Sequence, residues 1–154
     1  MKYDTQTPYL AAFAIVQDEA GKIAFVLRTN TGWMNGHYGL PSGKVEKNES
    51  FIAGAVREAK EEIGITVDAK DLEHAITVHR YSEAGSGDTV DTEWVDVYFL
   101  TKKYSGKLYN AEPHMHSELA WLDPKSLPKN VIPAVAASIQ AWLEGKNYLE
   151  YGWK

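Results

Sequence analysis

Three glutamates in the segment 50–63 have a spacing that suits the binding of a divalent cation. Glu58, Glu61 and Glu62 are three and four residues apart, so in a helix their carboxylates share one arc of about 100°. Like charges placed this closely cost a helix roughly 0.2–0.5 kcal/mol for each pair. A glutamate-rich turn can simply face solvent, but three convergent carboxylates also supply the oxygen ligands that Mg²⁺ shares with water and substrate phosphates.

The three glutamates belong to a longer pattern of fixed spacing that runs from Gly43 to Ile65. The pattern is G-x5-E-x7-R-E-U-x-E-E-x-G-U, where U is normally a bulky aliphatic residue. Ala59, which is apolar but small, stands at the first U. Seven specified Gly, Glu or Arg identities within this segment favour a functional site over a solvated helix face.

This pattern resembles the signature of the Nudix hydrolases at every fixed position. The resemblance covers roughly residues 9–142, and Ser42 stands where many members have a second glycine. It implies one domain over residues 1–154, with the signature at 43–65, of the α+β class and folded as an α/β/α sandwich with a central mixed sheet. It also implies an enzyme that hydrolyses a diphosphate linkage in a nucleoside diphosphate joined to a group X, with the help of metal ions.

The resemblance assigns the metal ligands within the signature. Glu58 and Glu62 would be the core ligands of Mg²⁺, or of Mn²⁺ in its place, and Glu61 would share that shell. The carbonyl oxygen of Gly43 would be a further ligand, in keeping with the close approach that a glycine allows between the backbone and an ion.

Catalytic roles are also implied for residues next to the metal ligands. Arg57 would pair with Glu49 through its planar fork and would orient a ligand carboxylate. The general base is either Glu61, within the signature, or Glu118, which precedes a predicted strand and matches an acidic position in relatives. Glu118 can equally be an ordinary surface glutamate in a loop.

Two residues outside the signature are candidates for binding substrate. Arg28 ends a predicted strand just before the loop into the signature, where it could meet a phosphate or the base, or be an ordinary strand-end cation. Asn130 lies in the loop before the last predicted helix. Relatives that hydrolyse purine triphosphates carry an Asn at a similar place, and an amide can pair with a purine edge. The alternative role for Asn130 is to cap that helix.

The expected reaction is the Mg²⁺-dependent hydrolysis of a purine nucleoside triphosphate, such as the oxidised nucleotide 8-oxo-dGTP, to a monophosphate and pyrophosphate. A dinucleoside polyphosphate hydrolase is an alternative, because Tyr81 lies 16 residues beyond Ile65 (81 − 65). An ADP-ribose hydrolase is a weaker one, because no proline occurs between Pro41 and Pro113. A Nudix domain that only senses a nucleotide is a fourth reading, although such domains typically lose the glutamates that are kept here.

Two further groups of residues lie outside the signature. His114 and His116 have neither a third partner nor a cysteine beside them, so we expect exposed loop histidines rather than a zinc site. Tyr148, Tyr151 and Trp153 make the C-terminal segment too aromatic for a free tail. We expect it to pack on the domain or on a second subunit, so a homodimer is left open.

Composition excludes several classes of protein. The chain of 154 residues has 16 Lys and Arg against 21 Asp and Glu, a net charge of −5 that argues against a broad basic face for a nucleic acid polymer. The chain has no cysteine, which excludes disulfides and thiolate metal sites. No apolar run approaches the roughly 20 residues that span a bilayer, and residues 1–8 lack a signal-peptide core. We therefore expect a cytoplasmic protein with a nucleotide as its partner and no membrane.

The elements that position the candidate site follow from hydrophobic periodicity and from glycine and proline. Segments 10–16 and 22–28 predict two strands of a hairpin, and 29–43 is mostly loop with a short strand at 38–40. Further strands are predicted at 73–81, 93–101 and 119–122. Helices are predicted at 50–63 and 132–144, each followed by a glycine, and Pro133 falls in the first turn of the second.

Overall fold

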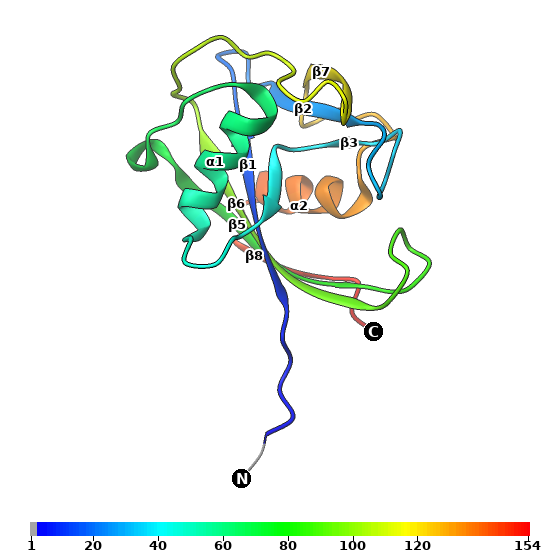
Figure 1. The fold of residues 1–154 in the computed structure, drawn as a ribbon. Helices are drawn as coiled ribbons and strands as arrows, with labels where there is room; N and C mark the ends of the chain where they lie inside the picture. Colours follow the sequence, from blue (N-terminus) through cyan, green and yellow to red (C-terminus); the bar gives the residue numbers. More distant parts are fainter. Residues whose placement is uncertain (1–2) are drawn as a thin grey trace.

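Strand β1 (Tyr9–Val16) lies at the centre of the computed structural model, which describes residues 3–154 (Figure 1). It pairs antiparallel with β4 (Ser42–Lys44) on one side and parallel with β6 (Thr92–Thr101) on the other. Strand β5 (Glu73–Ser82) pairs antiparallel with β6 and parallel with β8 (Tyr148–Tyr151). The result is the predicted mixed sheet, with the strand order β4-β1-β6-β5-β8.

A second sheet contains β2 (Ile23–Arg28) between β3 (Tyr38–Gly39) and β7 (His116–Leu122), all antiparallel. The predicted hairpin between segments 10–16 and 22–28 is therefore wrong, since β1 and β2 belong to different sheets and the bridge from Gln17 to Ile23 lies beyond the end of β1. The physical reason is that β4 and β6 already occupy both edges of β1.

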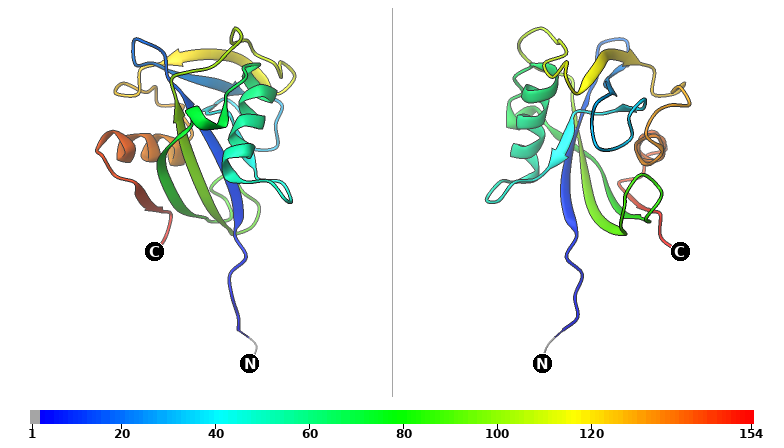
Figure 2. Two further views of the ribbon diagram at one scale, coloured as in Figure 1. Left: turned by 90° about the vertical axis from the view of Figure 1, so that its left-hand side faces the viewer. Right: turned by 45° about the vertical axis from the view of Figure 1, so that its right-hand side comes forward.

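Two helices cover opposite faces of the five-stranded sheet (Figure 2). Helix α1 (Phe51–Ile63) begins one residue after the predicted start, because Ser50 is its N-cap, and it ends before Gly64, which has a φ of 75°. Helix α2 (Pro133–Leu143) has its proline in the first turn, as predicted. A short 3₁₀ helix, η1 (Ala69–Asp71), lies between α1 and β5. Both predicted α-helices are thus confirmed, with α2 one residue shorter at each end.

The buried residues of β1 are divided between two hydrophobic cores, because side chains alternate across a strand. One core lies between the sheet and α2, where the ring of Phe13 stacks on Tyr98 at 4.3 Å between centroids. The other lies between the sheet and α1, and receives Ala12, Ala14 and Val16. This arrangement is the predicted α/β/α sandwich.

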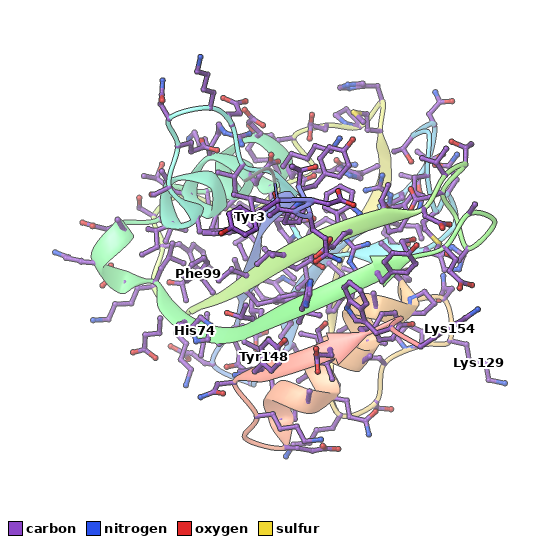
Figure 3. The ribbon with its side chains drawn as sticks, turned by 90° about the horizontal axis from the view of Figure 1, so that it is seen from below. Tyr3, His74, Phe99, Lys129, Tyr148 and Lys154 are labelled. Atoms are coloured by element: carbon purple, nitrogen blue, oxygen red, sulfur yellow. The ribbon has the colours of Figure 1, made fainter. Side chains whose placement is uncertain are left out.

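The C-terminal segment packs on the domain through β8 and the residues after it (Figure 3). The indole N–H of Trp153 donates to the carbonyl of His79 at 2.9 Å, and its ring lies 5.1 Å from that of Tyr81. The C-terminal segment therefore packs on the domain, which is the first of the two alternatives predicted for it. Residues 1–2, the start of the predicted domain and of the polar segment 1–8, lie outside the described residues. No helix within 3–154 is long and apolar enough to cross a membrane.

The glycine after β8 provides a test of this packing. Gly152 and Gly145 have nearly the same left-handed φ, 83° and 82°. A Cβ on Gly152 would lie 2.0 Å from the carbonyl oxygen of Tyr81, whereas a Cβ on Gly145 would meet nothing within 4 Å. Both alanine variants should lose about 1 kcal/mol of unfolding free energy from backbone strain. Gly152→Ala should lose more, because the clash separates the C-terminal segment from β5. Urea unfolding measures both, and equal losses would contradict the packing.

Candidate functional site

Helix α1 presents its three glutamates to a cavity of about 500 Å³ that the start of α2 lines from the other side. Glu61 is exposed at the rim, but Glu58 and Glu62 are only 9% and 7% exposed. Two of the three carboxylates are therefore buried, which excludes the reading of this helix turn as a solvated face.

Arg57 holds the carboxylates in place through a network of hydrogen bonds. Its fork donates twice to Glu49, from Nε at 2.7 Å and from Nη2 at 2.9 Å. Nη2 also donates to the carbonyl of Lys44 at 3.1 Å. Nη1 donates to Glu58 at 2.8 Å and to Glu61 at 3.2 Å. The predicted pair of Arg57 and Glu49 is present, and hydrogen bonding to Arg57 lowers the pKa of Glu49 to about 2.

The backbone of β4 lies directly against these carboxylates. A Cβ on Gly43 would lie 2.1 Å from Oε1 of Glu58, so the glycine is required by contact with this side chain. The neighbouring N–H of Ser42 donates to Oε2 of Glu62 at 2.8 Å. Because a backbone N–H serves here, this contact does not depend on the side chain of Ser42.

Burial disfavours the charged forms of the two buried carboxylates, Glu58 and Glu62. It raises the pKa of Glu58 to about 7, against the effect of Arg57, and raises the pKa of Glu62 well above its usual range. Repulsion from Glu112 adds to both shifts. A bound cation would relieve this repulsion, and the oxygen donors here fit Mg²⁺ or Mn²⁺. Glu58, Glu61, Glu62 and the carbonyl of Gly43 are thus candidate metal ligands.

His116 and Glu112 were not predicted for this site, yet both lie beside Glu62. His116 is 2% exposed, which corrects the expectation that both histidines of this loop are exposed; only His114 is. The reason is that β7 begins at His116, three residues earlier than predicted, where it pairs with Arg28 of β2. Burial, with Arg28 nearby, lowers the pKa of the imidazole to about 4.

The structure does not bring Glu118 or Asn130 to the cavity. Glu118 accepts a hydrogen bond from the hydroxyl of Tyr38 at 3.1 Å and is exposed. The exposed amide of Asn130 donates to the carbonyl of Gly36 at 3.1 Å, and the N-cap of α2 is Ile132 rather than Asn130.

The remainder of the cavity combines aromatic rings with cations. Arg28 lines it, as the sequence suggested, and its Nε donates to the carbonyl of Trp33 at 2.9 Å. Farther in, Arg80 forms a buried ion pair with Asp96 at 2.6 Å, and its guanidinium lies 4.7 Å from the ring of Trp94. This pair joins adjacent strands, and nothing in the sequence pattern marked it. Tyr81, the next residue, lines a second hollow instead.

Comparison with known proteins identifies relatives of the chain. The model of the NUDIX domain family matches residues 7–143. An uncharacterized Nudix hydrolase of Bacillus subtilis (strain 168), YvcI, is 28% identical over 102 residues, which make up 66% of this chain and 58% of that relative. The chain thus aligns with less than two thirds of this curated relative's length.

Solved structures share the fold. A MutT NUDIX hydrolase from Burkholderia pseudomallei has a TM-score of 0.75 and 26% identity, over 88% of this chain and 98% of that one. A MutT protein from Methanosarcina mazei Go1 has a TM-score of 0.74 and 22% identity, over 92% and 98% of the two chains.

Substitution of Gly43 tests the contact between β4 and the glutamates. Gly43→Ala should weaken Mn²⁺ binding about tenfold or more, because the new methyl group displaces the Glu58 carboxylate from its hydrogen bond with Arg57. Gly32→Ala is the matched control, because a Cβ there meets nothing within 4 Å. Mn²⁺ titration followed by electron paramagnetic resonance measures both. Equal affinities in the two variants would contradict the proposed contact.

The raised pKa values of the two buried glutamates also predict how the free energy of unfolding depends on pH. Because the pKa values of Glu58 and Glu62 are raised on folding, the folded chain holds protons that the unfolded chain releases. Without metal, the free energy of unfolding should therefore fall from about pH 6.5 to about pH 8. Below this window His116, whose pKa is lowered, acts in the opposite direction.

Urea unfolding in EDTA at both pH values measures this slope. Glu62→Gln should flatten it, because the amide does not titrate. Glu144→Gln is the control, because hydrogen bonds from Lys146 and Gln140 lower the pKa of this exposed carboxyl, so that it stays ionised throughout the window. A slope unchanged by Glu62→Gln would show that the buried carboxylates do not carry the excess protons.

Proposed function

Because the chain belongs to the NUDIX family, whose model matches residues 7–143, we propose that it hydrolyses a diphosphate linkage in a nucleoside diphosphate joined to a group X. One observation carries the proposal: Glu58 and Glu62 are buried side by side on α1, against the backbone of β4 and at the wall of a cavity of about 500 Å³. A cavity of this size suits a ligand as large as a nucleotide.

We propose that Gly43, Glu58, Glu61 and Glu62 hold Mg²⁺, with Mn²⁺ as a substitute. When bound, such a cation neutralises phosphate charge and lowers the pKa of water. Six carboxylates and three basic side chains line the cavity, so an uncompensated polyphosphate would be repelled. This excess of acidic over basic side chains supports a requirement for a metal ion.

The chain's own residues would orient the reacting groups. Arg57 keeps Glu58 and Glu61 in position, because its Nη1 donates a hydrogen bond to each carboxylate. Glu61, exposed at the cavity rim, is our candidate for the base that takes a proton from the attacking water. Glu118 is the weaker candidate, since its carboxylate is bound by Tyr38 outside the cavity.

We further propose a purine nucleoside triphosphate as the substrate, with a monophosphate and pyrophosphate as products. Arg28, which lines the cavity, would meet a phosphate. The ion pair of Arg80 and Asp96 sets a donor beside an acceptor, which complements the O6 and N1–H edge of guanine. Adenine presents the reverse order. Oxidation at C8 adds an N7–H donor, so 8-oxo-dGTP fits an acceptor such as Asp96 as well.

Two other proposals concern the binding partner of the chain and its location in the cell. The net charge of −5 supports a small nucleotide over a nucleic acid polymer as the partner. A cytoplasmic location and a homodimer stay predictions.

A panel of substrates tests this function. With Mg²⁺ or Mn²⁺, turnover of GTP, dGTP, 8-oxo-dGTP, ATP, a dinucleoside polyphosphate and ADP-ribose is compared by kcat/KM, with products separated by chromatography. We expect the guanine-type triphosphates to be preferred and pyrophosphate to be released. Preference for the dinucleoside polyphosphate or ADP-ribose would change the substrate class, and binding without any turnover would favour a nucleotide-sensing domain.

Variants assign the roles within the same assay. Glu62→Gln should lower kcat about 100-fold or more, because it removes a ligand charge while preserving shape. Glu61→Gln should lower kcat far more than Glu118→Gln if Glu61 is the base. The opposite order would assign the base to Glu118, and circular dichroism checks that each variant remains folded.

A further inference from the structure

We propose that Glu62, Glu112 and His116 form a metal site of mixed nitrogen and oxygen donors that prefers a first-row transition ion, such as Co²⁺ or Zn²⁺, over Mg²⁺. This inference deepens the proposed metal-dependent function and rests on it for the role of Glu62. It adds a donor set that the all-oxygen signature does not contain.

The three side chains converge from separate parts of the chain. Glu62 is in the last turn of α1, Glu112 is in the loop before β7, and His116 is the first residue of β7. Their ligand atoms all lie within 4.8 Å of one another, and Nε2 of His116 is 3.9 Å from Oε1 of Glu62. Bond lengths of about 2.0–2.2 Å to one ion are therefore reached by small rotations of side chains.

The burial of His116 is the independent observation that points to a ligand. Its imidazole is 2% exposed, and within residues 3–154 its Nδ1 has no hydrogen-bond partner. Buried polar atoms are normally paired, so an imidazole buried among carboxylates without a hydrogen bond requires another explanation. Nε2, the ring atom that faces Glu62, makes no hydrogen bond within the described part of the chain either, and an ion bound between His116 and the two glutamates would give it a polar partner.

The donor types set the preference among ions. Mg²⁺ takes oxygen ligands in near-octahedral geometry, whereas imidazole suits Zn²⁺, Co²⁺ and similar ions. The proposed ligands within the signature, which are the carboxylates of Glu58, Glu61 and Glu62 and the carbonyl of Gly43, all offer oxygen. The site with His116 therefore shares Glu62 with that set and differs from it by one nitrogen.

Cobalt provides a direct probe, because its paramagnetism shifts the proton signals of a coordinated imidazole. The chain is freed of metal with EDTA and titrated with Co²⁺ and, separately, Mg²⁺ by calorimetry, without nucleotide. Proton NMR of the Co²⁺ form looks for a shifted, exchangeable imidazole N–H. We expect Co²⁺ to bind about tenfold or more tightly than Mg²⁺ and the shifted signal to appear.

Matched variants identify the histidine. His116→Gln should remove the shifted signal and weaken Co²⁺ binding about tenfold or more, with little change for Mg²⁺. His114→Ala, two residues away and exposed, should change neither. If His116→Gln does not fold, Glu112→Gln in the loop should weaken Co²⁺ binding in the same way. Equal Co²⁺ affinity in wild type, His116→Gln and Glu112→Gln, or Co²⁺ binding no tighter than Mg²⁺, would overturn the proposal.

The result is separate from that of the substrate panel. Loss of the Co²⁺ signal in His116→Gln with no turnover of any substrate would uphold the site and reject the enzyme. Turnover in Mg²⁺ with no imidazole signal would reject this site and leave the proposed function in place.

Discussion

The contact between the Glu58 carboxylate and the backbone at Gly43 is the constraint on which the candidate site depends. Helix α1 can approach β4 this closely only because no Cβ stands between them. The same approach lets the N–H of Ser42 reach Glu62, and lets Arg57 reach the carbonyl of Lys44. One missing methyl group thus sets the distance between a helix and a strand, and with it the position of two buried carboxylates.

The residues that make this contact lie close together in the sequence, within or next to the pattern from Gly43 to Ile65. The sequence pointed to a close approach of the backbone at Gly43, but to an ion rather than to the side chain of Glu58. Helix α1 and its end at Gly64 follow from spacing within 23 residues, and the pair of Arg57 with Glu49 followed from the resemblance over the same segment. The α/β/α sandwich followed from the resemblance, and the structure shows it as two cores on opposite faces of the sheet. The hairpin failed because spacing along the chain does not reveal which strands occupy the two edges of β1.

The other half of the cavity depends on contacts distant in sequence, and there prediction from the chain alone was weaker. Arg80 and Asp96 meet because β5 and β6 pair in one register, which neither strand's pattern specifies. His116 is buried because β7 starts three residues before its apolar run, as a continuation of pairing with β2. Glu118 and Asn130 were plausible by position, but their side chains bind Tyr38 and Gly36 instead.

Glu62 is the residue at which these two halves meet. Its Oε2 accepts from the backbone N–H of Ser42, directly before the signature, whereas its Oε1 faces His116, far from the signature in sequence. A signature shared by many chains can therefore supply the same carboxylates, while the strands and loops around it supply different neighbours. It follows that the preference for an ion or a base should be sought in residues such as His116, Glu112 and Arg80. The signature, by contrast, accounts for the part of the chemistry that family members have in common.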